Sequence, residues 1–444
     1  MLLLPDHVWT GTAIHTGWAV EVDGDHIVGL SPAPRHSDAI IRLPGRILVP
    51  GLVDAHSHAF QRAFRGHVQW SSSAKDDFWT WRDAMYRAAN GLDPDGVEAV
   101  SKLLFLELVR AGVTTVGEFH YLHHTPDGTP YADPDELAHR VIVAARDVGL
   151  RIVLLRCVYA TSAIGQPLRA DQRRFRDAHA EAPLAAVGRL RSRWAADPGV
   201  RVGLAPHSVR AVPEDWLRQY TAFDGPIHAH VAEQPAEVAA CFAATGRSPL
   251  GVFADAGLVD ARFVAVHLTH PSAGDVDRLV AGDATVAVCP STELDLGDGF
   301  FPIDARRARM CVGTDSHAAT DLLAEARALE YHGRALALRR VILAKPGERH
   351  GVAERVLAAA SVAGDRALGG AGRGIAPGAP ADLVAIDLRA PDAAGVPPLE
   401  AAALLATPAW IDRVWVGGRE IVTGGRHARE DAIVAAARPY LTKG

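Results

Sequence analysis

The sequence is poor in cysteine. Its 444 residues include only four, Cys157, Cys241, Cys289 and Cys311, and no two of them form a C-x-x-C pair. Three of the four lie in apolar runs that are typical of buried strands. The spacing argues against a disulfide framework, and we expect reduced thiols in the core of a cytoplasmic protein.

Long basic runs and long apolar runs are also absent. The net charge is −6, which argues against nucleic acid or an anionic membrane as the main partner. No apolar stretch reaches the roughly 18 to 20 residues that a membrane-spanning helix needs. The opening "MLLLPDHVWTG" lacks a basic start and meets a proline at once, so we expect no secretory signal.

The composition that remains is that of an ordinary globular enzyme with many histidines. Hydrophobic residues make up 48% of the chain and charged residues 22%. The length suffices for a large core, in one large domain or in two to three smaller ones. The 21 histidines are the unusual count, and several of them follow apolar runs.

Short strands and turns are predicted at both ends of the chain. Residues 1–48 contain apolar runs separated by a Gly24-Asp25 turn, and the C-terminal "ADLVAIDL" and "IDRVWVGGREIV" have the same character. The Pro/Gly-rich "GRGIAPGAPAD" precedes them. We predict that residues 1–48 and 371–444 together form one small β-sandwich domain.

The middle of the chain alternates between strand-like and helix-like segments. Eight short β-branched runs recur, among them "RIVLLRCVY" and "RFVAVHLTH", and segments such as 95–112 and 133–150 between them are helix-like. Apolar strands joined by helices are typical of parallel sheets covered on both faces. Residues 49–370 are therefore predicted to form an α/β fold, the (β/α)8 barrel. The rival, a doubly wound open sheet, lacks the G-x-G-x-x-G that would follow its first strand.

Polar residues close most of these strands. In a barrel enzyme, the chemistry takes place at the C-terminal ends of the strands. The histidines and acids found at these ends are His56, His58, Glu118, His120, His207, His228, His230, Glu233, His267, His270, Asp315 and His317. One such histidine would be an ordinary polar residue, but so many strand ends of this kind indicate a shared site.

Two of the strands end in a His-x-His pattern. Alternate residues of a strand face the same side, so His56 and His58, and likewise His228 and His230, can both face the barrel mouth. Three imidazoles and a carboxylate from the first, fifth and eighth strands would form a divalent-metal site with an open position for water. The alternative is that His-x-His is only a polar entry into a loop.

Longer stretches resemble a known family. "PGLVDAHSH" after a small β segment, a later "HAH", a histidine on the next strand and "GTDSH" resemble the amidohydrolase superfamily. Within it, the chain resembles the formimidoylglutamate deiminases of bacterial histidine degradation, through "HSHAFQRAFRG", "DDFWTWRDAMY", "EFHYLHH", "APHSVRAV", "HAHVAEQ" and "CPSTELDLGDGFFP". The resemblance covers nearly the whole chain. One departure is Asp295, where the family pattern has asparagine.

The resemblance implies the metal ligands His56, His58, His230 and Asp315. It also implies that Glu233 passes a proton to the leaving nitrogen and that His267, with Asp315, orients or helps to deprotonate the metal-bound water. No strand-ending lysine occurs near the fourth strand, where binuclear relatives carry a bridging lysine, so one divalent metal is expected. Zinc suits three histidines and an aspartate, although iron or manganese would also bind.

The substrate that the resemblance implies has two carboxylates, which need cationic or multiple donors once they are desolvated. Arg210, three residues after His207, is the expected bidentate partner. The expected neutral donors are Gln61, Tyr121 and His207. Arg65 and Arg82 are further cationic candidates, and each of these residues has a surface or structural role as its alternative. His228 is expected to support a ligand, whereas no role is assigned to Trp79, Trp81, His123, His124 and His317.

These features together predict hydrolytic deimination of N-formimino-L-glutamate to N-formyl-L-glutamate and ammonia. The alternative is another aminohydrolase of the superfamily, acting on a guanine-like heterocyclic amine or on a different formimino-amino acid. An inactive metal-binding scaffold would require the loss of Glu233 or His267, and both are present. We expect a cytoplasmic homodimer that binds a small dicarboxylate, and neither nucleic acid nor membrane.

Overall fold

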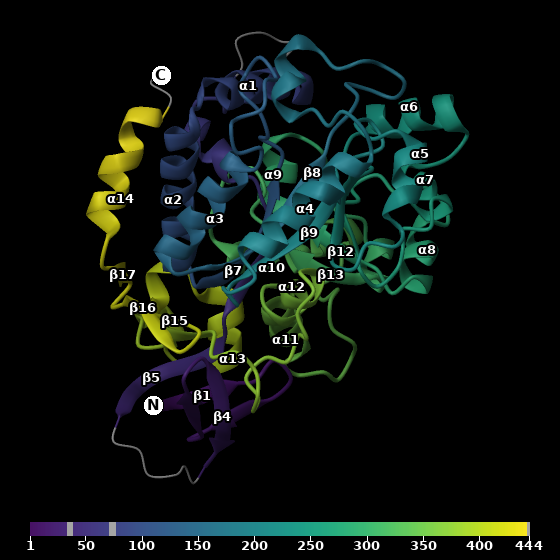
Figure 1. Cartoon of the computed structure of the whole chain (residues 1–444). Coiled ribbons are helices and arrows are strands. Elements are labelled where there is room, and N and C mark those ends of the chain that lie inside the picture. The colour runs from purple at the N-terminus through teal and green to yellow at the C-terminus, as the bar shows by residue number, and fades with distance from the viewer. Residues whose placement is uncertain (33–38, 71–76, 442–444) are drawn as a thin grey trace.

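The computed structural model describes residues 1–32, 39–70 and 77–441. It contains a barrel surrounded by helices and, at one end of the barrel, a smaller β domain that includes the N-terminus (Figure 1). Among the described residues, no helix is long and apolar enough to cross a membrane.

Eight parallel strands form the barrel in chain order. They are β6 (Leu52–Ser57), β7 (Val113–His120), β8 (Arg151–Val158), β9 (Val200–Pro206), β10 (Ile227–Val231), β11 (Phe263–His267), β12 (Thr285–Val288) and β13 (Arg309–Val312). Most of their residues are buried, as near-continuous Val, Ile and Leu runs predict for strands that are covered on both faces. The predicted barrel is confirmed. We call the C-terminal ends of these strands the mouth and the N-terminal ends the base.

The barrel closes where the end of β6 meets the loop after β13. The Asp315 amide donates to the His56 carbonyl at 2.9 Å, and the His58 amide donates to the Asp315 carbonyl at 3.2 Å. Gly313 permits this approach, because a Cβ at that position would lie 2.7–2.8 Å from atoms of His56. Closure excludes the open sheet, and it brings three polar strand-end residues side by side.

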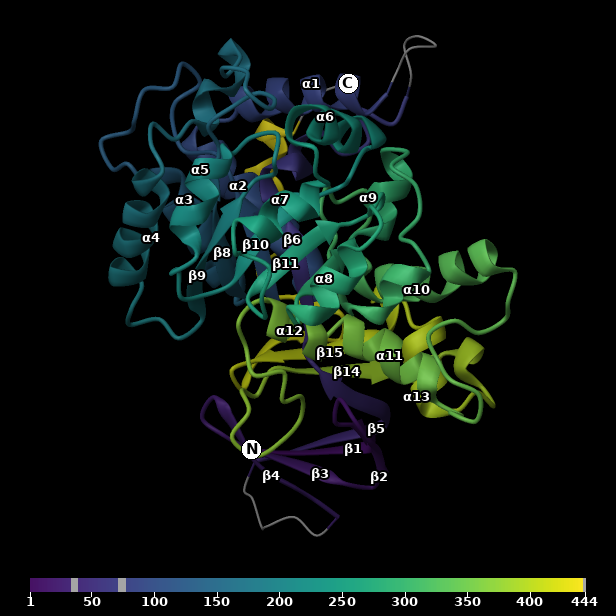
Figure 2. The ribbon, with the colours of Figure 1, turned by 90° about the vertical axis from the view of Figure 1, so that its right-hand side faces the viewer.

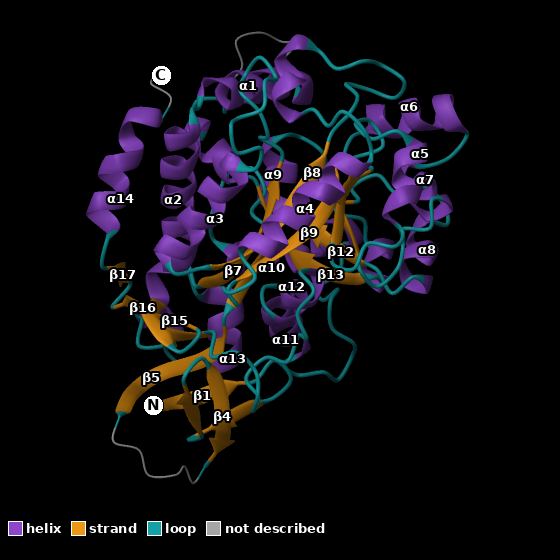
Figure 3. Cartoon of the chain, in the orientation of Figure 1, coloured by secondary structure: helices purple, strands orange, loops and turns teal. Residues whose placement is uncertain are grey.

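Helices cover the outside of the barrel (Figure 3). They are α1 (Phe78–Gly91), α2 (Pro94–Arg110), α3 (Glu136–Val148), α4 (Glu181–Arg193), α5 (Glu214–Leu217), α6 (Pro235–Thr245), α7 (Pro249–Asp255), α8 (Asp275–Ala281), α9 (Pro290–Asp295), α10 (Leu322–Ala337), α11 (Gly351–Ala359) and α12 (Val362–Ala367). α3 shows the pattern, since Leu137, Val141, Ala144 and Val148 recur at helical spacing and are buried. α12 packs at the base, where Gly364 lies against Val53.

Strands from both ends of the chain form one mixed sheet. They are β1 (Leu2–Trp9), β2 (Ile14–Thr16), β3 (Ala19–Asp23), β4 (His26–Ser31), β5 (Ile40–Pro50), β14 (Leu383–Asp387), β15 (Ile411–Val416), β16 (Arg419–Thr423) and β17 (Arg426–His427). β5 pairs in parallel with β1 and antiparallel with β14, so strands of the N-terminal and C-terminal segments lie side by side (Figure 2). The composite β domain is confirmed. All of its strands except β2, which pairs with β1, follow one hydrogen-bonded path rather than two separate sheets, because β14 adds directly to β5.

The C-terminal segment does not stay within the β domain. After η6 (Ala401–Leu405) and the strands, α14 (Glu430–Ala437) packs along α2 of the barrel. Arg110 and Glu430 form an ion pair at 3.1 Å across this contact. The boundaries 1–48, 49–370 and 371–444 therefore stay a prediction.

The cysteines take part in the packed interior. All four are buried and free. Cys157 belongs to the large apolar cluster that joins the barrel to its helices, and Cys289 and Cys311 to a smaller cluster between strands. This is the inert core role that the sequence predicts.

Candidate active site

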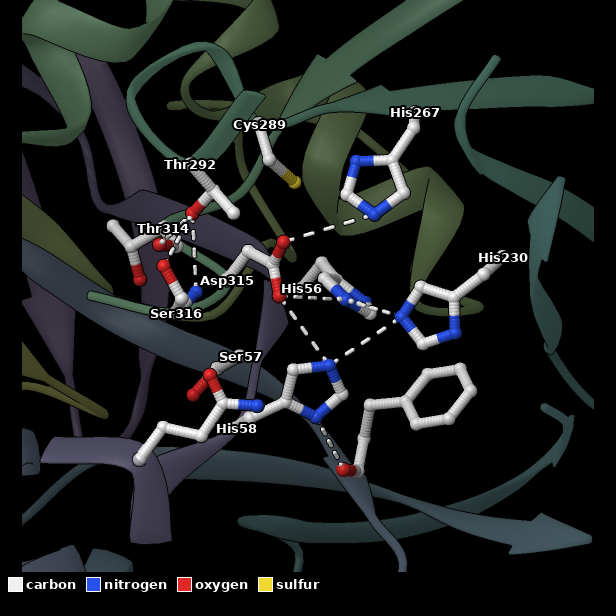
Figure 4. A network of polar contacts seen from close by, with 12 residues as sticks. His56, Ser57, His58, His230, His267, Cys289, Thr292, Thr314, Asp315 and Ser316 are labelled. Carbon is white, nitrogen blue, oxygen red and sulfur yellow. Dashed lines mark hydrogen bonds and ion pairs between the residues drawn. The ribbon is translucent and has the colours of Figure 1, made fainter. Parts of the chain in front are cut away.

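The four predicted metal ligands, His56, His58, His230 and Asp315, converge at the mouth (Figure 4). His230 Nε2 lies 3.2 Å from His56 Nε2 and 3.4 Å from His58 Nε2. Asp315 Oδ1 lies 3.4 Å from His56 Nε2 and 3.3 Å from His58 Nε2. The ends of β6, β10 and β13 supply these side chains, which we call the four-ligand cluster.

Two nitrogens of this cluster, Nε2 of His58 and Nε2 of His230, face each other as lone pairs. His58 Nδ1 donates to the Phe119 carbonyl at 2.9 Å, and His230 Nδ1 donates to the His207 carbonyl at 3.1 Å. A neutral imidazole that carries its proton on Nδ1 has none on Nε2, so two bare nitrogens 3.4 Å apart repel unless a cation lies between them. Separations of 3.2–3.4 Å match the edges of a tetrahedron whose corners lie about 2.0–2.1 Å from its centre, the usual zinc–nitrogen distance. The residues present therefore fit a divalent metal.

Burial keeps the imidazoles in the protonation state that binds metal. Desolvation lowers the pKa of His56 to about 3, and it also lowers the pKa of His58 and His230. Burial would raise the pKa of Asp315, but the hydrogen bond with His56 and the neighbouring imidazoles lower it. Neutral histidines and a charged aspartate are the forms that ligate a cation.

Two groups that can carry protons, His267 and Glu233, lie beside one side of the four-ligand cluster. His267 Nε2 lies 3.7 Å from Asp315 Oδ2 and 3.7 Å from Glu233 Oε1. These distances are too long for direct hydrogen bonds and suit one oxygen atom held between the three groups. Glu293, in α9, lies 3.4 Å from His267 Nδ1. Burial would lower the pKa of His267, but the contact with Glu293 and the charges of Glu233 and Asp315 raise it to about 10.

A pocket opens beside the cluster, and the predicted neutral donors line it. Gln61, Tyr121 and His207 share this pocket with His58, His230 and Asp315. Gln61 Nε2 donates to the Tyr121 hydroxyl at 3.0 Å. Gln61 Oε1 is buried and finds no partner among the residues that the structure describes. The structure thus places all three predicted donors next to the candidate metal position.

Arg210 also lines the pocket, but it already has partners. Its Nη2 donates to Glu233 Oε2 at 2.9 Å, and its Nε lies 3.9 Å from Glu237 Oε2. Only Nε and Nη2 of Arg210 donate to described side chains, so Nη1 keeps two N–H groups for a ligand. Arg210 can therefore hold Glu233 and an anion at the same time, which the sequence did not indicate.

The other two arginines differ in position. Arg82, in α1, lines the pocket, and its Nε is buried without a partner in the described part of the chain. Arg65 instead pairs with Glu107 at 2.7 Å and donates to the His317 carbonyl at 3.3 Å. Arg65 is not among the lining residues, so the structure favours Arg82 as the second cation.

Two buried strand-end residues support the ligands without binding the cluster. Glu118 accepts hydrogen bonds from the Ser57 hydroxyl at 2.6 Å and the Ala59 amide at 2.8 Å, which holds the turn after β6. His317 Nε2 accepts from the His58 amide at 3.3 Å. The polar residues at the strand ends therefore include positioning residues as well as candidate ligands.

The expectation that His228 supports a ligand is wrong. His228 Nε2 donates to the Ala367 carbonyl at 3.0 Å, at the end of α12 and thus towards the base. A residue two positions earlier on a strand lies roughly 7 Å deeper, which explains the difference from His230. The pocket lining likewise leaves out the histidines His120, His123, His124, His270 and His317, and the residue Trp79.

Apart from Arg82, the sequence-based interpretation missed one wall of the pocket. Phe78, Trp81, Arg82 and Met85 of α1 all line it, together with Tyr86. Their spacing of three, four and seven residues is that of one helix face, so the period was readable in "FWTWRDAMY". Tyr159 and Ser208 also line the pocket, and no local pattern marks them.

Comparisons with known proteins agree with this geometry. The amidohydrolase family model matches residues 47–421. The chain is 37% identical to the formimidoylglutamate deiminase of Pseudomonas aeruginosa over 434 residues, 94% of each protein. It is 27% identical to a 5-methylthioadenosine/S-adenosylhomocysteine deaminase of Halobacterium salinarum over 383 residues, 84% of this chain and 80% of that protein. The crystal structure of an amidohydrolase from Brucella melitensis superposes with a TM-score of 0.91 at 32% identity, covering 99% of this chain and 98% of the other.

Proposed function

We propose that this chain, which belongs to the amidohydrolase family of metal-dependent hydrolases, removes ammonia from N-formimino-L-glutamate. The reaction consumes one water and yields N-formyl-L-glutamate. The family membership is the premise, and the choice of substrate is the proposal. The similarity to a formimidoylglutamate deiminase over 94% of the chain supports this choice.

The observation that carries the substrate choice is the pair of guanidinium groups beside the four-ligand cluster. Arg82 and Arg210 line the same pocket as His58 and Asp315. Arg82 Nε is buried without a described partner, and a buried cationic donor is costly unless a ligand supplies an acceptor. A dicarboxylate supplies such acceptors, and arginine binds carboxylates through parallel hydrogen bonds.

The residues of the four-ligand cluster and the residues beside it have different roles in the proposed reaction. His56, His58, His230 and Asp315 would hold the metal, which supplies a water of lowered pKa at neutral pH. His267 and Asp315 orient the attacking oxygen between them. Glu233, three residues after His230, reaches the same position and delivers a proton to the departing nitrogen. Arg210 holds Glu233 in place through its Nη2.

A second candidate is deamination of a heterocyclic amine, as the name of the Halobacterium salinarum relative describes for that protein. An amidine carbon bearing two nitrogens is common to both substrate types, so the four-ligand cluster alone does not distinguish them. The aromatic side chains of Phe78, Trp81 and Tyr121 in the pocket are the observation that favours a ring. The two arginines favour the formimino acid, because a neutral ring needs no carboxylate partner.

An ammonia-release assay tests the proposal. The protein would be loaded with zinc and tested against N-formimino-L-glutamate, N-formimino-L-aspartate, guanine and 5-methylthioadenosine, with metal content measured on the same sample. We expect the highest kcat/KM with N-formimino-L-glutamate and about one divalent ion per chain. Faster release of ammonia from either ring would show that the substrate choice is wrong, while the hydrolase assignment would stand.

The metal and the assembly are proposed on general grounds. Three histidines and an aspartate suit zinc, and parallel samples loaded with iron or manganese would identify the metal that supports the highest turnover. A homodimer and a cytoplasmic location stay predictions, which gel filtration with light scattering and cell fractionation would check.

A further inference from the structure

Three buried polar side chains form a triangle in one wall of the pocket. The Tyr86 hydroxyl of α1 lies 3.2 Å from the Tyr159 hydroxyl, which follows β8. Gln172, in η2 (Ala170–Phe175), places its Nε2 3.0 Å from each of the two hydroxyls. All three side chains are almost fully buried, and both tyrosines line the pocket that contains Glu233 and Asp315.

The orientation of the glutamine amide is determined by its other end. Gln172 Oε1 accepts a hydrogen bond from the Arg169 amide at 3.0 Å, so Nε2 is the atom that faces the tyrosines. An amide nitrogen donates and does not accept. Gln172 can therefore satisfy acceptors in the triangle, but it cannot take a proton from either hydroxyl.

One of the two tyrosine hydroxyl groups in the triangle lacks an acceptor for its hydrogen. The two hydroxyl groups carry two hydrogens, and only one of them can lie between Tyr86 and Tyr159. The other has no acceptor within the triangle, and within residues 1–32, 39–70 and 77–441 neither hydroxyl donates to any further group. A buried O–H without an acceptor is unfavourable, so the pocket has to supply the acceptor.

The position of Tyr159 indicates which hydroxyl is left over and what it binds. Its ring lies 4.9 Å from the His207 ring, whose own ring lies 4.7 Å from that of His230. Burial raises the pKa of Tyr159 well above its usual value, while the charges of Arg82 and Arg210 act on it in the opposite sense. The hydroxyl thus stays a neutral donor, and Tyr159 lines the same pocket as the two cations, Glu233 and Asp315, which suits the binding of an anion.

We propose that Tyr159 donates its hydroxyl proton to a carboxylate of the substrate, that Tyr86 donates to Tyr159, and that Gln172 positions both. The inference rests on the proposed function, because the carboxylate belongs to the formimino acid. Arg82 and Arg210 supply the charge, and the Tyr159 hydroxyl adds a directional contact that a substrate without a carboxylate cannot use. Because only a substrate with a carboxylate can accept this hydrogen bond, Tyr159 determines the specificity for such substrates.

Substitution by phenylalanine removes the hydroxyl and keeps the ring. In the zinc-loaded full-length enzyme, Tyr159→Phe should lower kcat/KM for N-formimino-L-glutamate by about 10- to 100-fold, the cost of a hydrogen bond to a charged acceptor. Turnover of N-butylformamidine, which has no carboxylate, should change less than about twofold. Tyr86→Phe leaves the Tyr159 hydroxyl in place and should cost clearly less than Tyr159→Phe. Equal losses on both substrates, or no loss on either, would overturn the proposal.

Tyr220→Phe is a matched control, because Tyr220 is also fully buried and donates to the Ala180 carbonyl at 3.1 Å, away from the pocket. It should leave both activities at the wild-type level. Thermal unfolding of each variant would show whether the chain still folds.

Binding of glutarate separates a failure of this inference from a failure of the proposed function. Glutarate carries two carboxylates and no reacting carbon, so its dissociation constant, measured by calorimetry, should rise in Tyr159→Phe by the same factor as the loss in kcat/KM. If the wild type deiminates no formimino acid but binds glutarate through Tyr159, only the substrate choice fails. If the wild type is active and Tyr159→Phe binds glutarate as tightly as the wild type, only the inference fails.

Discussion

At the mouth of the barrel, buried imidazole nitrogens face one another, whereas at the base a half-buried arginine faces a carboxylate. His230 Nε2 lies 3.2 Å from His56 Nε2 at the mouth. At the base, Arg151 Nε lies 2.7 Å from Asp382 Oδ2, and the other Asp382 oxygen accepts from the Gly417 amide at 2.7 Å. A cavity of about 310 Å³ also lies at the base, and its walls contain paired charges and glycines.

The paired charges at the base contribute to stability, whereas the unpaired polar groups at the mouth indicate a functional site. Matched charges stabilise the junction between barrel and β domain and need nothing else. Lone pairs and donors without partners are unfavourable for the folded chain by itself, and they persist where a ligand satisfies them. Cavity size does not identify the mouth, whereas the unsatisfied groups do. Substitutions at the mouth should therefore lower activity more than stability, and those at the base the reverse.

The largest effect is expected from removing a ligand at the mouth. His230→Ala should lower the metal content from about one ion per chain to near zero and reduce turnover at least about 10³-fold. The metal-free variant should unfold at or above the temperature of the metal-free wild type, since one of the facing lone pairs is gone. Elemental analysis, ammonia release and calorimetry check the three parts. A variant that keeps its metal and its activity would contradict the four-ligand cluster.

The next effect concerns the proton carrier. Glu233→Gln keeps the shape and the metal ligands but cannot carry a proton, so turnover should fall by roughly 10²-fold or more at unchanged metal content. Glu214→Gln is the matched control, because Glu214 forms a half-buried pair with Arg247 and does not line the pocket. If Glu233→Gln turned over the substrate at the wild-type rate, Glu233 would have a structural role and would not carry the proton.

Substitutions of Arg210 and of Arg82 should lower the activity on different sets of substrates. Losing Arg210 leaves a buried partner unpaired and should cost about 3–5 kcal/mol in kcat/KM. Because Arg210 also holds Glu233, Arg210→Ala should slow N-butylformamidine as well. Arg82→Ala should cost about 10- to 100-fold with N-formimino-L-glutamate alone. Identical substrate profiles for both variants would rule out this division.

Lysine is the informative conservative change at Arg210. It restores the charge but not the planar pair of donors, so Arg210→Lys should recover only part of the loss. Arg189→Ala, which removes a partner of Asp135 away from the mouth, controls for the loss of any arginine. Steady-state kinetics on both substrates provides the measurement.

The smallest effect on activity is expected at the base. Arg151→Ala leaves Asp382 with only its amide partner and should lower stability by about 1–3 kcal/mol, with kcat/KM unchanged. Thermal unfolding and ammonia release check this on one sample. A fall in kcat/KM without a fall in unfolding temperature would show that the base takes part in function.

Much of the fold could be predicted because the signals are local. Apolar β-branched runs and helical periodicity mark the strands and helices, and the same alternation that predicts a strand also places His56 and His58 on one side of it. The composite β domain was predictable in membership but not in form. Whether β14 pairs with β5 or stacks on it depends on contacts between the two ends of the chain.

The sequence by itself determined the residue types at the strand ends, their spacing, and so the presence of a candidate metal site at the mouth. Only the tertiary structure decided which polar groups meet there. In the folded chain, His228 donates a hydrogen bond to α12 and Arg65 pairs with Glu107. Arg210 pairs with Glu233, and Tyr86, Tyr159 and Gln172 form one hydrogen-bonded group. The physical reason is that period and propensity act over a few residues, whereas these partners are up to 139 positions apart in the chain and meet only when the barrel closes.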